Sequence, residues 1–305
     1  MTTTTATRPA DVPAGPRTYR HRRITPARVT LHVFLTIVAV SWFFPVAWAL
    51  LNSFRDYSYT SIHGYVSFGG WTLDNYKNAW ERGDFTSHFL NSVYITVPAV
   101  VLTLFLSACV AFVLARFSFR FNIVLLGLFT AANLLPQQSL LIPLFRLYRM
   151  IPLPYWMSDS GMLLDSYWGL ILVNTAFQTG FCAFVLSNYM KTLPKELFES
   201  AMVDGASVWR QFWQITIPLC RPPLAALAVL EVTWIYNEFF WATVLVQTGA
   251  KFPVTSSLNN LRGEFFTDLN LVSAGSVLIA IPVLVIFFIL QKQFVAGLTL
   301  GSTKG

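Results

Sequence analysis

Charged side chains are scarce in this chain. They make up only 11% of its 305 residues, whereas hydrophobic residues make up 55% and the mean hydropathy is +0.55. A soluble globular protein carries roughly 25% charged residues, so this chain has too little charge to cover itself with a water-facing surface. The scarcity excludes a soluble enzyme or binding domain and indicates a membrane protein.

The sequence also lacks the residue patterns of several chemistries. It has only three cysteines, Cys109, Cys182 and Cys220, which are interpreted as small apolar packing residues without a structural disulfide. The four histidines are scattered singly, so no metal site is expected. No Gly-x-x-x-x-Gly-Lys-Ser/Thr loop is present, and the chain therefore cannot cradle the phosphates of ATP by itself.

Long apolar runs are what the chain does contain. A membrane-spanning helix needs about 20 mainly apolar residues, and the sequence predicts six spans, the fifth interrupted only by Glu231 and Glu238. The first span follows a polar stretch and lacks a small-residue cleavage site, which favours a retained anchor over a cleaved signal peptide. The six predicted spans cover about 29–54, 89–115, 121–145, 166–190, 222–246 and 269–291 of a permease domain at 29–300.

The distribution of Lys and Arg predicts the orientation. If the N-terminus is cytoplasmic, that side holds 14 of the 21 basic residues and the other side holds 7, and the side richer in Lys and Arg is normally cytoplasmic. We therefore expect an all-α, multi-pass protein with both termini in the cytoplasm. Residues 1–28, rich in Thr, Pro and Arg, indicate a disordered basic tail close to anionic lipid headgroups.

Polar residues within the predicted spans are candidates for a substrate path. Glu231 and Glu238 are seven residues apart and would share one face of a helix. Because a carboxylate inside a bilayer is costly, the two either line a polar path or make structural hydrogen bonds to another helix. Amide side chains in spans 3 and 4 suit uncharged, hydroxyl-rich solutes such as sugars, or hold helices together. These amides are Asn133, Gln137, Asn174 and Gln178.

The cytoplasmic passage 191–221 is too polar to span a bilayer and too apolar for a solvated loop. Pro194 suits the first turn of a helix, and "KELFESAMV" places Leu197, Phe198, Ala201 and Met202 on one face. Asp204-Gly205 is expected to end this helix, because Gly accepts backbone angles that other residues resist. Ser207 can cap a second helix over 208–216. The passage therefore predicts two short helices joined by a hinge.

The spacing in this passage resembles the signature of ATP-binding-cassette (ABC) importer permeases. That signature reads Glu-Ala-Ala, three residues, Gly, nine residues, Ile, one residue, Leu-Pro; Ser200 and Ile217 are mild departures from it. The matching positions are Glu199, Ser200, Ala201, Gly205, Ile215, Ile217 and Pro218. Asp204-Gly205-Ala206 is similar to the carbohydrate-uptake branch of these permeases, and the chain as a whole resembles the small-subunit type of maltose permease.

Further stretches carry the same resemblance, which covers about residues 29–300. They are "LDNYKNAW" (73–80), "ARFSFR" (115–120), "IPLFRLYRMI" (142–151) and "YNEF" (236–239). "YNEF" is similar to Trp-Asn-Glu-Phe in span 5 of sugar permeases, and it adds Asn237 to the candidate substrate path.

The resemblance implies a role without catalysis by this chain. The helix pair would dock on a dimeric ATPase that binds ATP and Mg, with Glu199 pairing with a basic group of the ATPase and Ala201 permitting close approach. Gly205 would set the angle between the helices, and Trp209 and Phe212 would pack near the joint. The chain would pair with a second homologous permease in the bacterial cytoplasmic membrane, where an extracytoplasmic sugar-binding lipoprotein delivers a di- or oligosaccharide.

Two other classes of protein compete with this interpretation. An intramembrane serine protease would need a Gly-x-Ser-Gly nucleophile and a membrane histidine, whereas Ser207 is followed by Val208 with no histidine nearby. An ion-coupled secondary transporter commonly has repeated halves and mid-membrane charges. Glu231 gives this second class some support, but no repeat is visible and the helix pair would be unexplained.

Overall fold

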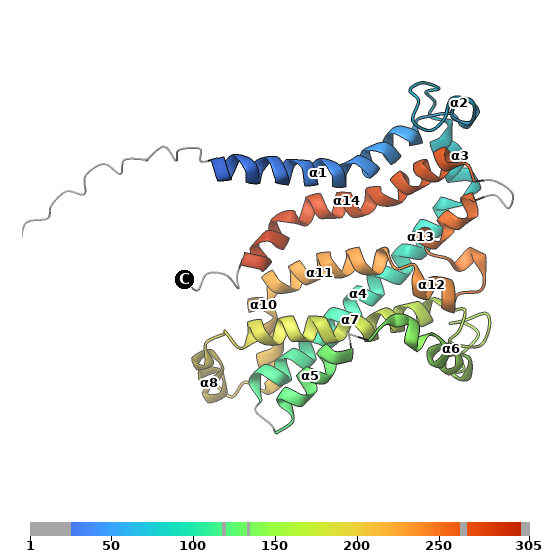
Figure 1. Cartoon of the computed structure of the whole chain (residues 1–305). Coiled ribbons are helices and arrows are strands. Elements are labelled where there is room, and N and C mark those ends of the chain that lie inside the picture. The colour runs from blue at the N-terminus through green and yellow to red at the C-terminus, as the bar shows by residue number, and fades with distance from the viewer. Residues whose placement is uncertain (1–25, 118–119, 133–134, 263–266, 300–305) are drawn as a thin grey trace, which may run out of the picture. The chain divides into compact units, whose positions relative to one another are not determined.

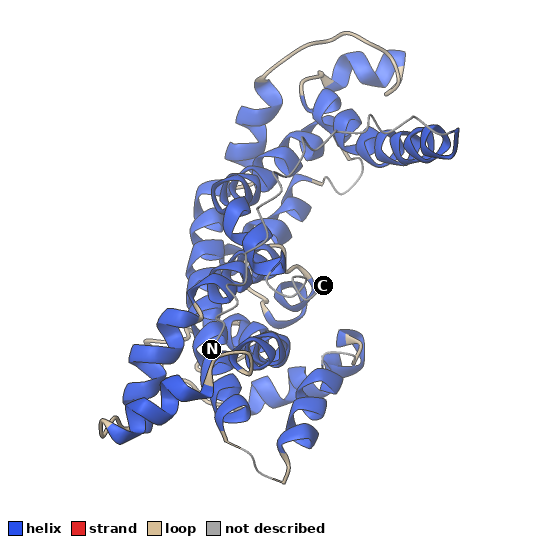
Figure 2. Cartoon of the chain, turned by 90° about the vertical axis from the view of Figure 1, so that its left-hand side faces the viewer, coloured by secondary structure: helices blue, strands red, loops and turns tan. Residues whose placement is uncertain are grey.

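The computed structural model of the chain describes residues 26–117, 120–132, 135–262 and 267–299. The chain forms two units, residues 1–47 and residues 48–305. Every regular element among the described residues is a helix, and the antiparallel bridges Arg55–Trp71 and Pro152–Met162 are isolated (Figure 2). The predicted all-α class is confirmed.

The described part of the first unit is one helix. Helix α1 runs from Pro26 to Ser53, so its last residues belong to the second unit. Proline suits its first turn because the N–H groups there have no partner within the helix. These bounds agree closely with the predicted span at 29–54, whereas most of the predicted tail lies outside the described residues.

Buried Arg55 organises the segment that follows α1, which carries α2 (Tyr57–His63) and α3 (Asp74–Arg82). Its side chain is fully buried and donates to the carbonyls of Tyr65 and Gly69 at 2.9 and 3.1 Å, to Oδ1 of Asn52 at 3.0 Å and to Oγ of Ser67 at 2.6 Å. A buried cation is tolerated when its donors are satisfied in this way. The segment is therefore folded around one guanidinium group.

Helices α4 (Phe85–Arg116) and α7 (Tyr167–Met190) form the centre of the second unit. They pack along each other (Figure 1), and small buried Ala108 and Ala111 of α4 lie in one core cluster with Cys182 and Leu186 of α7. Small side chains let helix backbones approach closely, which is how helices associate in a membrane. Ser107 Oγ also donates to the carbonyl of Thr179 at 3.0 Å.

The third predicted span, 121–145, is not one continuous helix. Helix α5 (Asn122–Ala132) is followed by the 3₁₀ turn η1 (Gln137–Leu140) and by α6 (Leu141–Met150). Pro136, directly before η1, is extended with ψ of 128°. Proline has no N–H to donate and disfavours a helical residue before it, which explains the interruption.

The fifth predicted span, 222–246, is interrupted as well. Helix α11 (Arg221–Tyr236) ends before Glu238, and α12 (Phe240–Leu245) begins after it. The carboxylate of Glu238 accepts the N–H groups of Trp241 at 2.7 Å and Ala242 at 3.1 Å, which satisfies free donors at the start of α12. Glu231 and Glu238 therefore do not share a helix face, contrary to the sequence prediction.

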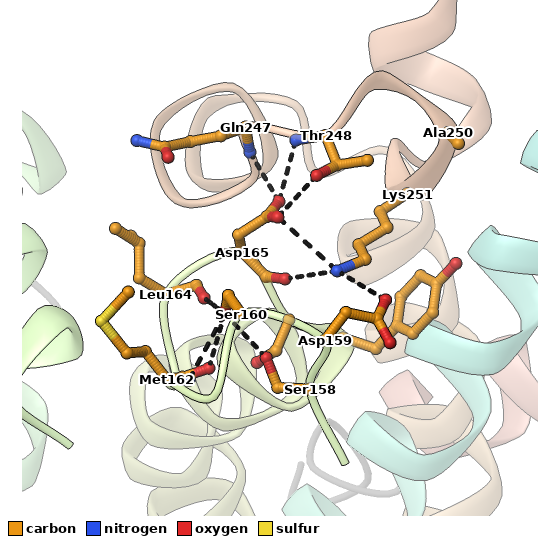
Figure 3. Close-up of polar contacts among 12 residues, drawn as sticks. Ser158, Asp159, Ser160, Met162, Leu164, Asp165, Gln247, Thr248, Ala250 and Lys251 are labelled. Carbon is orange, nitrogen blue, oxygen red and sulfur yellow. Dashed lines mark hydrogen bonds and ion pairs between the residues drawn. The ribbon is translucent and has the colours of Figure 1, made fainter. Parts of the chain in front are cut away.

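Asp165, in the loop before α7, binds the loop after α12 through hydrogen bonds (Figure 3). Its Oδ1 accepts the N–H groups of Gln247 at 2.8 Å and Thr248 at 2.9 Å, and its Oδ2 accepts the Thr248 hydroxyl at 2.6 Å and lies 3.5 Å from Nζ of Lys251. Burial opposes the charge of this carboxylate, but the hydrogen bonds from Thr248 and Gln247 and the charge of Lys251 outweigh it and lower the pKa of Asp165. The loop is held by an ionised carboxylate.

Short helical turns and one long helix complete the second unit. The turns are η3 (Gly249–Lys251), α13 (Val254–Ser257) and η4 (Leu258–Leu261). His88 and Asn91 of α4 contact the carbonyl of Phe252 at 2.7 and 3.0 Å and so hold this region against the bundle. Helix α14 (Leu269–Thr299) extends beyond its predicted end at 291 and packs on α11 and α3.

Four helices in the described residues are long and apolar enough to cross a membrane. They are α1, α4, α7 and the Leu269–Ile289 part of α14. A fifth is obtained if Val208–Leu219 and Arg221–Tyr236, bent by 74° from each other, count as one span. Six spans and the orientation of the termini stay predictions.

Candidate functional site

The turn between the two short helices has a specific backbone structure. Helix α8 runs from Lys195 to Val203 after Pro194. At its end the N–H of Gly205 donates to the carbonyl of Met202 at 3.0 Å, and the N–H of Ala206 donates to that of Ala201 at 2.8 Å. This pair of bonds is the Schellman ending of a helix, which requires a left-handed residue. Gly205 supplies it with φ of 75°.

The second short helix begins where the sequence predicts but continues differently. Ser207 Oγ accepts the N–H of Arg210 at 3.3 Å and caps α9 (Val208–Gln211). The π-helical turn η2 (Phe212–Thr216) and α10 (Ile217–Leu219) follow, in place of one regular helix over 208–216. The N–H of Ile217 bonds to Phe212 five residues back, directly before Pro218, which has no N–H.

Aromatic packing holds the helix pair against the ends of the long helices. Phe198 and Phe212 are 5% and 1% exposed. The ring of Phe212 packs edge-on against Phe112 of α4, with 5.4 Å between ring centroids, and stacks on Trp209 at 5.5 Å. Trp209 and Phe212 therefore pack on each other and Phe212 packs on α4, while their role at the joint stays a prediction.

Many other residues of the helix pair, within and outside the signature, form an exposed surface. Leu197 and Met202 of the predicted apolar face are exposed, and only Phe198 of that face is buried. Trp209, which is 58% exposed, and Val208 are exposed as well. A side chain at Gly205 would meet nothing within 4 Å. Glu199, Ser200 and Asp204 are exposed, while Ala201, Ala206 and Pro218 are half-buried.

Two contacts of the helix pair were not predicted from the sequence. Gln211 is 3% exposed and donates from Nε2 to the carbonyl of Ala206 at 3.0 Å, which ties α9 to the turn. The guanidinium carbon of Arg116, at the end of α4, lies 4.5 Å from the ring centroid of Phe198. Neither residue belongs to the signature, and only their place in the fold reveals them.

A pocket between α7, α11 and α12 brings together five of the predicted path residues. Its volume is about 530 Å³. Gln178 is the twelfth of the 24 residues of α7, roughly 17 Å from the first residue at 1.5 Å per residue, so the pocket lies near mid-span. The predicted path residues that line it are Gln137, Asn174, Gln178, Asn237 and Glu238.

The polar groups of the pocket differ in their availability. Gln137 and Gln178 make no side-chain hydrogen bond within the described part of the chain. Asn174 and Asn237 donate to the carbonyls of Leu170 and Thr233 and keep their amide oxygens. The two glutamine amides can therefore bind a ligand without giving up a hydrogen bond to any residue that the structure describes.

Aromatic rings form the rest of the pocket wall. They are Phe177, Phe181, Trp234, Phe239, Phe240 and Trp241. None was a candidate from the sequence, although Phe177 adjoins Gln178 and "EFFW" at 238–241 adjoins Asn237. Glu238 is the only ionisable residue in the lining, and its oxygens are already bound to α12. The pocket thus offers aromatic faces and uncharged amides.

Two predicted path residues are not placed at this pocket. Glu231 is fully buried and accepts a hydrogen bond from Sγ of Cys182 on α7 at 3.0 Å. Its environment corresponds to the interhelical hydrogen bond that was the alternative to a path residue. Asn133 lies outside the described residues.

Comparison with known proteins identifies relatives over nearly the whole chain. The model of the family "Binding-protein-dependent transport system inner membrane component" matches residues 68–299. The arabinooligosaccharides transport system permease protein AraQ of Halalkalibacterium halodurans is 32% identical over 276 residues, which cover 89% of this chain and 94% of the relative. The osmoprotective compounds uptake permease protein GgtD of Synechocystis sp. is 31% identical and covers 91% and 92%, respectively.

A solved structure supports the fold. A chain from the crystal structure of a bacterial ABC transporter involved in the import of the acidic polysaccharide alginate matches with a TM-score of 0.71 and 24% identity, over 87% of this chain and 95% of that chain. The family match covers most of the sequence and includes the helix pair and the long helices α4, α7 and α14. This chain belongs to the family of inner membrane components of binding-protein-dependent transport systems.

Proposed function

We propose that this chain is a permease subunit of an ABC importer that carries an uncharged di- or oligosaccharide across the bacterial cytoplasmic membrane. Its substrate path includes the pocket between α7, α11 and α12, and its α8–α9 pair is the contact for the ATPase. The observation that carries the proposal is the mid-span pocket, which combines aromatic rings with uncharged amide side chains.

The lining of the pocket supports a neutral sugar as the substrate. Sugars present hydroxyl groups to amides and apolar C–H faces to aromatic rings, and a binding site gains specificity from a few placed polar groups in a mainly apolar wall. The lining residues that the structure describes include no Lys, Arg or His that would attract a uronic acid. The arabinooligosaccharide relative is a permease of the corresponding substrate class.

The exposed surface of the helix pair supports coupling to a partner. Tryptophan and other apolar side chains on a surface are typical of protein contacts, and Trp209, Met202 and Val208 are exposed beside Glu199. The partner we propose is an ATPase dimer, which binds ATP and Mg, while this chain binds no cofactor. Import then depends on the different affinity of the ATPase for two states of the permease.

The proposed assembly needs a complete set of spans and partners. We propose six spans with both termini cytoplasmic, in which α5 with η1 forms the third and α11 with α12 the fifth. A second homologous permease lies beside this chain. An extracytoplasmic sugar-binding protein meets the loops around α3 and η3, in keeping with the binding-protein dependence of the family.

A pair of neighbouring glutamines tests the substrate path. Gln137 lines the pocket and Gln138 is exposed outside it. In proteoliposomes that contain the complete transporter, Gln137→Ala and Gln178→Ala should each lower uptake of the labelled neutral oligosaccharide about threefold to tenfold, the range expected from one lost hydrogen bond. Gln138→Ala should not. Equal uptake by all three variants would contradict the path.

Variants of α8 and of the turn that follows it test the coupling role. Glu199→Lys should abolish ATP-dependent uptake while membrane insertion is retained, and Glu196→Lys on the same helix, outside the signature, should be tolerated. Gly205→Pro should also abolish uptake, because proline cannot adopt φ of 75°. Normal uptake and ATPase recruitment in both Glu199→Lys and Gly205→Pro would contradict the role. Uptake that persists without ATP but collapses with the ion gradient would favour a secondary transporter instead.

A further inference from the structure

A second pocket lies where α4 and α7 end and α8 begins. Its volume is about 480 Å³, and its wall includes the last residues of α4 and α7, the start of α5 and the first residues of α8. It is separate from the pocket between α7, α11 and α12, since no residue lines both. Neither the signature nor the candidate substrate path accounts for it.

All ionisable residues in the wall of this second pocket are cationic. They are Arg116, Lys191 and Lys195, and no acidic side chain is among the described residues of the wall. The ion pairs found in the described part of the chain involve only Lys251. The three cations likewise make no side-chain hydrogen bond to any described residue; the contact of Arg116 is with the ring of Phe198. The pocket therefore gathers positive charge that no described side chain neutralises.

Most of the remaining wall is apolar, and the polar side chains of Asn122 and Thr216 also line it. Phe112, Leu114, Met190 and Phe198 line the pocket, and each is at most 6% exposed, whereas Lys191 and Lys195 are exposed. Both α4 and α7 are long and apolar enough to span a bilayer, and the pocket sits at their ends. The end of a spanning helix lies at the level of the lipid headgroups whichever way the chain is oriented. Long cationic side chains at helix ends also extend to this interface.

We propose that this pocket binds the phosphate group of an anionic phospholipid such as phosphatidylglycerol. Lys and Arg donate charge-assisted hydrogen bonds to phosphate oxygens, and basic pockets between membrane helices bind anionic headgroups. The ligand contacts α4, α7 and α8 at once, so an occupied pocket also stabilises the position of α8. The proposal does not depend on the transported solute or on the identity of the ATPase.

Lipid retention by the full-length chain tests the proposal. The chain, purified with its partner permease, is titrated with phosphatidylglycerol in detergent and retained lipid is counted by native mass spectrometry. Lys191→Gln with Lys195→Gln should weaken phosphatidylglycerol retention about 25-fold, at about fivefold for each cation. Phosphatidylcholine, which carries no net charge, should be retained equally by wild type and variant.

Arg210→Gln is the matched control. Arg210 is an exposed cation of α9 outside the pocket, bound to Oε1 of Gln214 at 2.8 Å, and its loss should leave retention unchanged. A loss as large as that of the double lysine variant would show unspecific surface attraction and overturn the proposal. Millimolar inorganic phosphate should not displace the lipid; displacement at that concentration would assign the pocket to free phosphate instead. Unchanged retention in the double variant would also overturn it.

Discussion

The end of the second unit around α2, α3 and the η3 loop and the end around α8 and α9 are stabilised by different interactions. At the first end, Arg55, Asp165, His88 and Asn91 bind backbone groups of distant loops. At the second, the contacts to the bundle are mainly aromatic, through Phe198 and Phe212. The first end fixes its loops by hydrogen bonds made by buried side chains, whereas the second rests on the bundle mainly through aromatic rings.

This difference indicates which end can change its contacts. Polar networks fix loops in one geometry, because each broken bond leaves a buried group without a partner. A helix pair that rests on a few rings can move as a body while its exposed surface stays available. We therefore expect substitutions at the first end to lower stability, and those at the second to affect partner binding more than stability.

Arg55→Ala should have the largest effect on stability. It removes a buried guanidinium and leaves the oxygens of Asn52, Tyr65 and Gly69 without a donor, at a cost of about 3 kcal/mol or more in the free energy of unfolding. The melting temperature in detergent can be followed by a thiol-reactive dye, since Cys182 and Cys220 are buried. Arg82→Ala, at an exposed position of α3, should leave it unchanged. Equal melting temperatures of Arg55→Ala and the wild type would contradict the stabilising role of Arg55.

Asp165→Ala should have the second largest effect, about 1.5–3 kcal/mol, because a charged acceptor of several hydrogen bonds is lost. Since the pKa of Asp165 is lowered in the folded state, its contribution is present above about pH 4 and lost as the pH falls through the lowered value. Stability measured from pH 7 to 3 should therefore decline less steeply at the acid end in Asp165→Asn. An identical acid decline would contradict the role of the carboxylate.

Gly205→Ala should destabilise the chain by about 1–2 kcal/mol, the cost of a left-handed backbone for a residue with a side chain. Open space surrounds both Gly205 and Gly249, but only Gly205 has a positive φ, so Gly249→Ala is the matched control at the other end. Thermal denaturation of both variants separates backbone strain from side-chain clash. A loss of stability in both would contradict this cause.

Trp209→Ala should have the smallest effect on the isolated chain, about 0.5–1.5 kcal/mol for one exposed stacked ring. Recruitment of the ATPase, measured by co-purification, should fall much more strongly. A loss of stability in Trp209→Ala as large as in Arg55→Ala, with unchanged recruitment of the ATPase, would contradict the comparison. The α8–α9 end would then stabilise the fold in the same way as the opposite end.

Local sequence patterns predicted much of this protein. The apolar windows located α1, α4, α7 and α14 to within a few residues at most of their ends, and Pro194, Gly205 and Ser207 marked the limits of the short helices. The third and fifth windows were less accurate. Hydropathy averaged over a window does not register the backbone breaks at Pro136 and after Tyr236, because the polar residues there are few and apolar stretches lie before and after them.

The amino-acid sequence by itself determined the class of the protein, the range of its longest helices and the turn at Gly205, because hydrophobic length and backbone preference act over a few neighbouring residues. Only the tertiary structure decided which polar residues meet. Glu231 binds Cys182 49 residues away instead of sharing a face with Glu238, and Asp165 binds Gln247 82 residues away. The same holds for the two pockets, whose walls come from separate helices. Such contacts depend on the packing of distant helices, which no local pattern specifies.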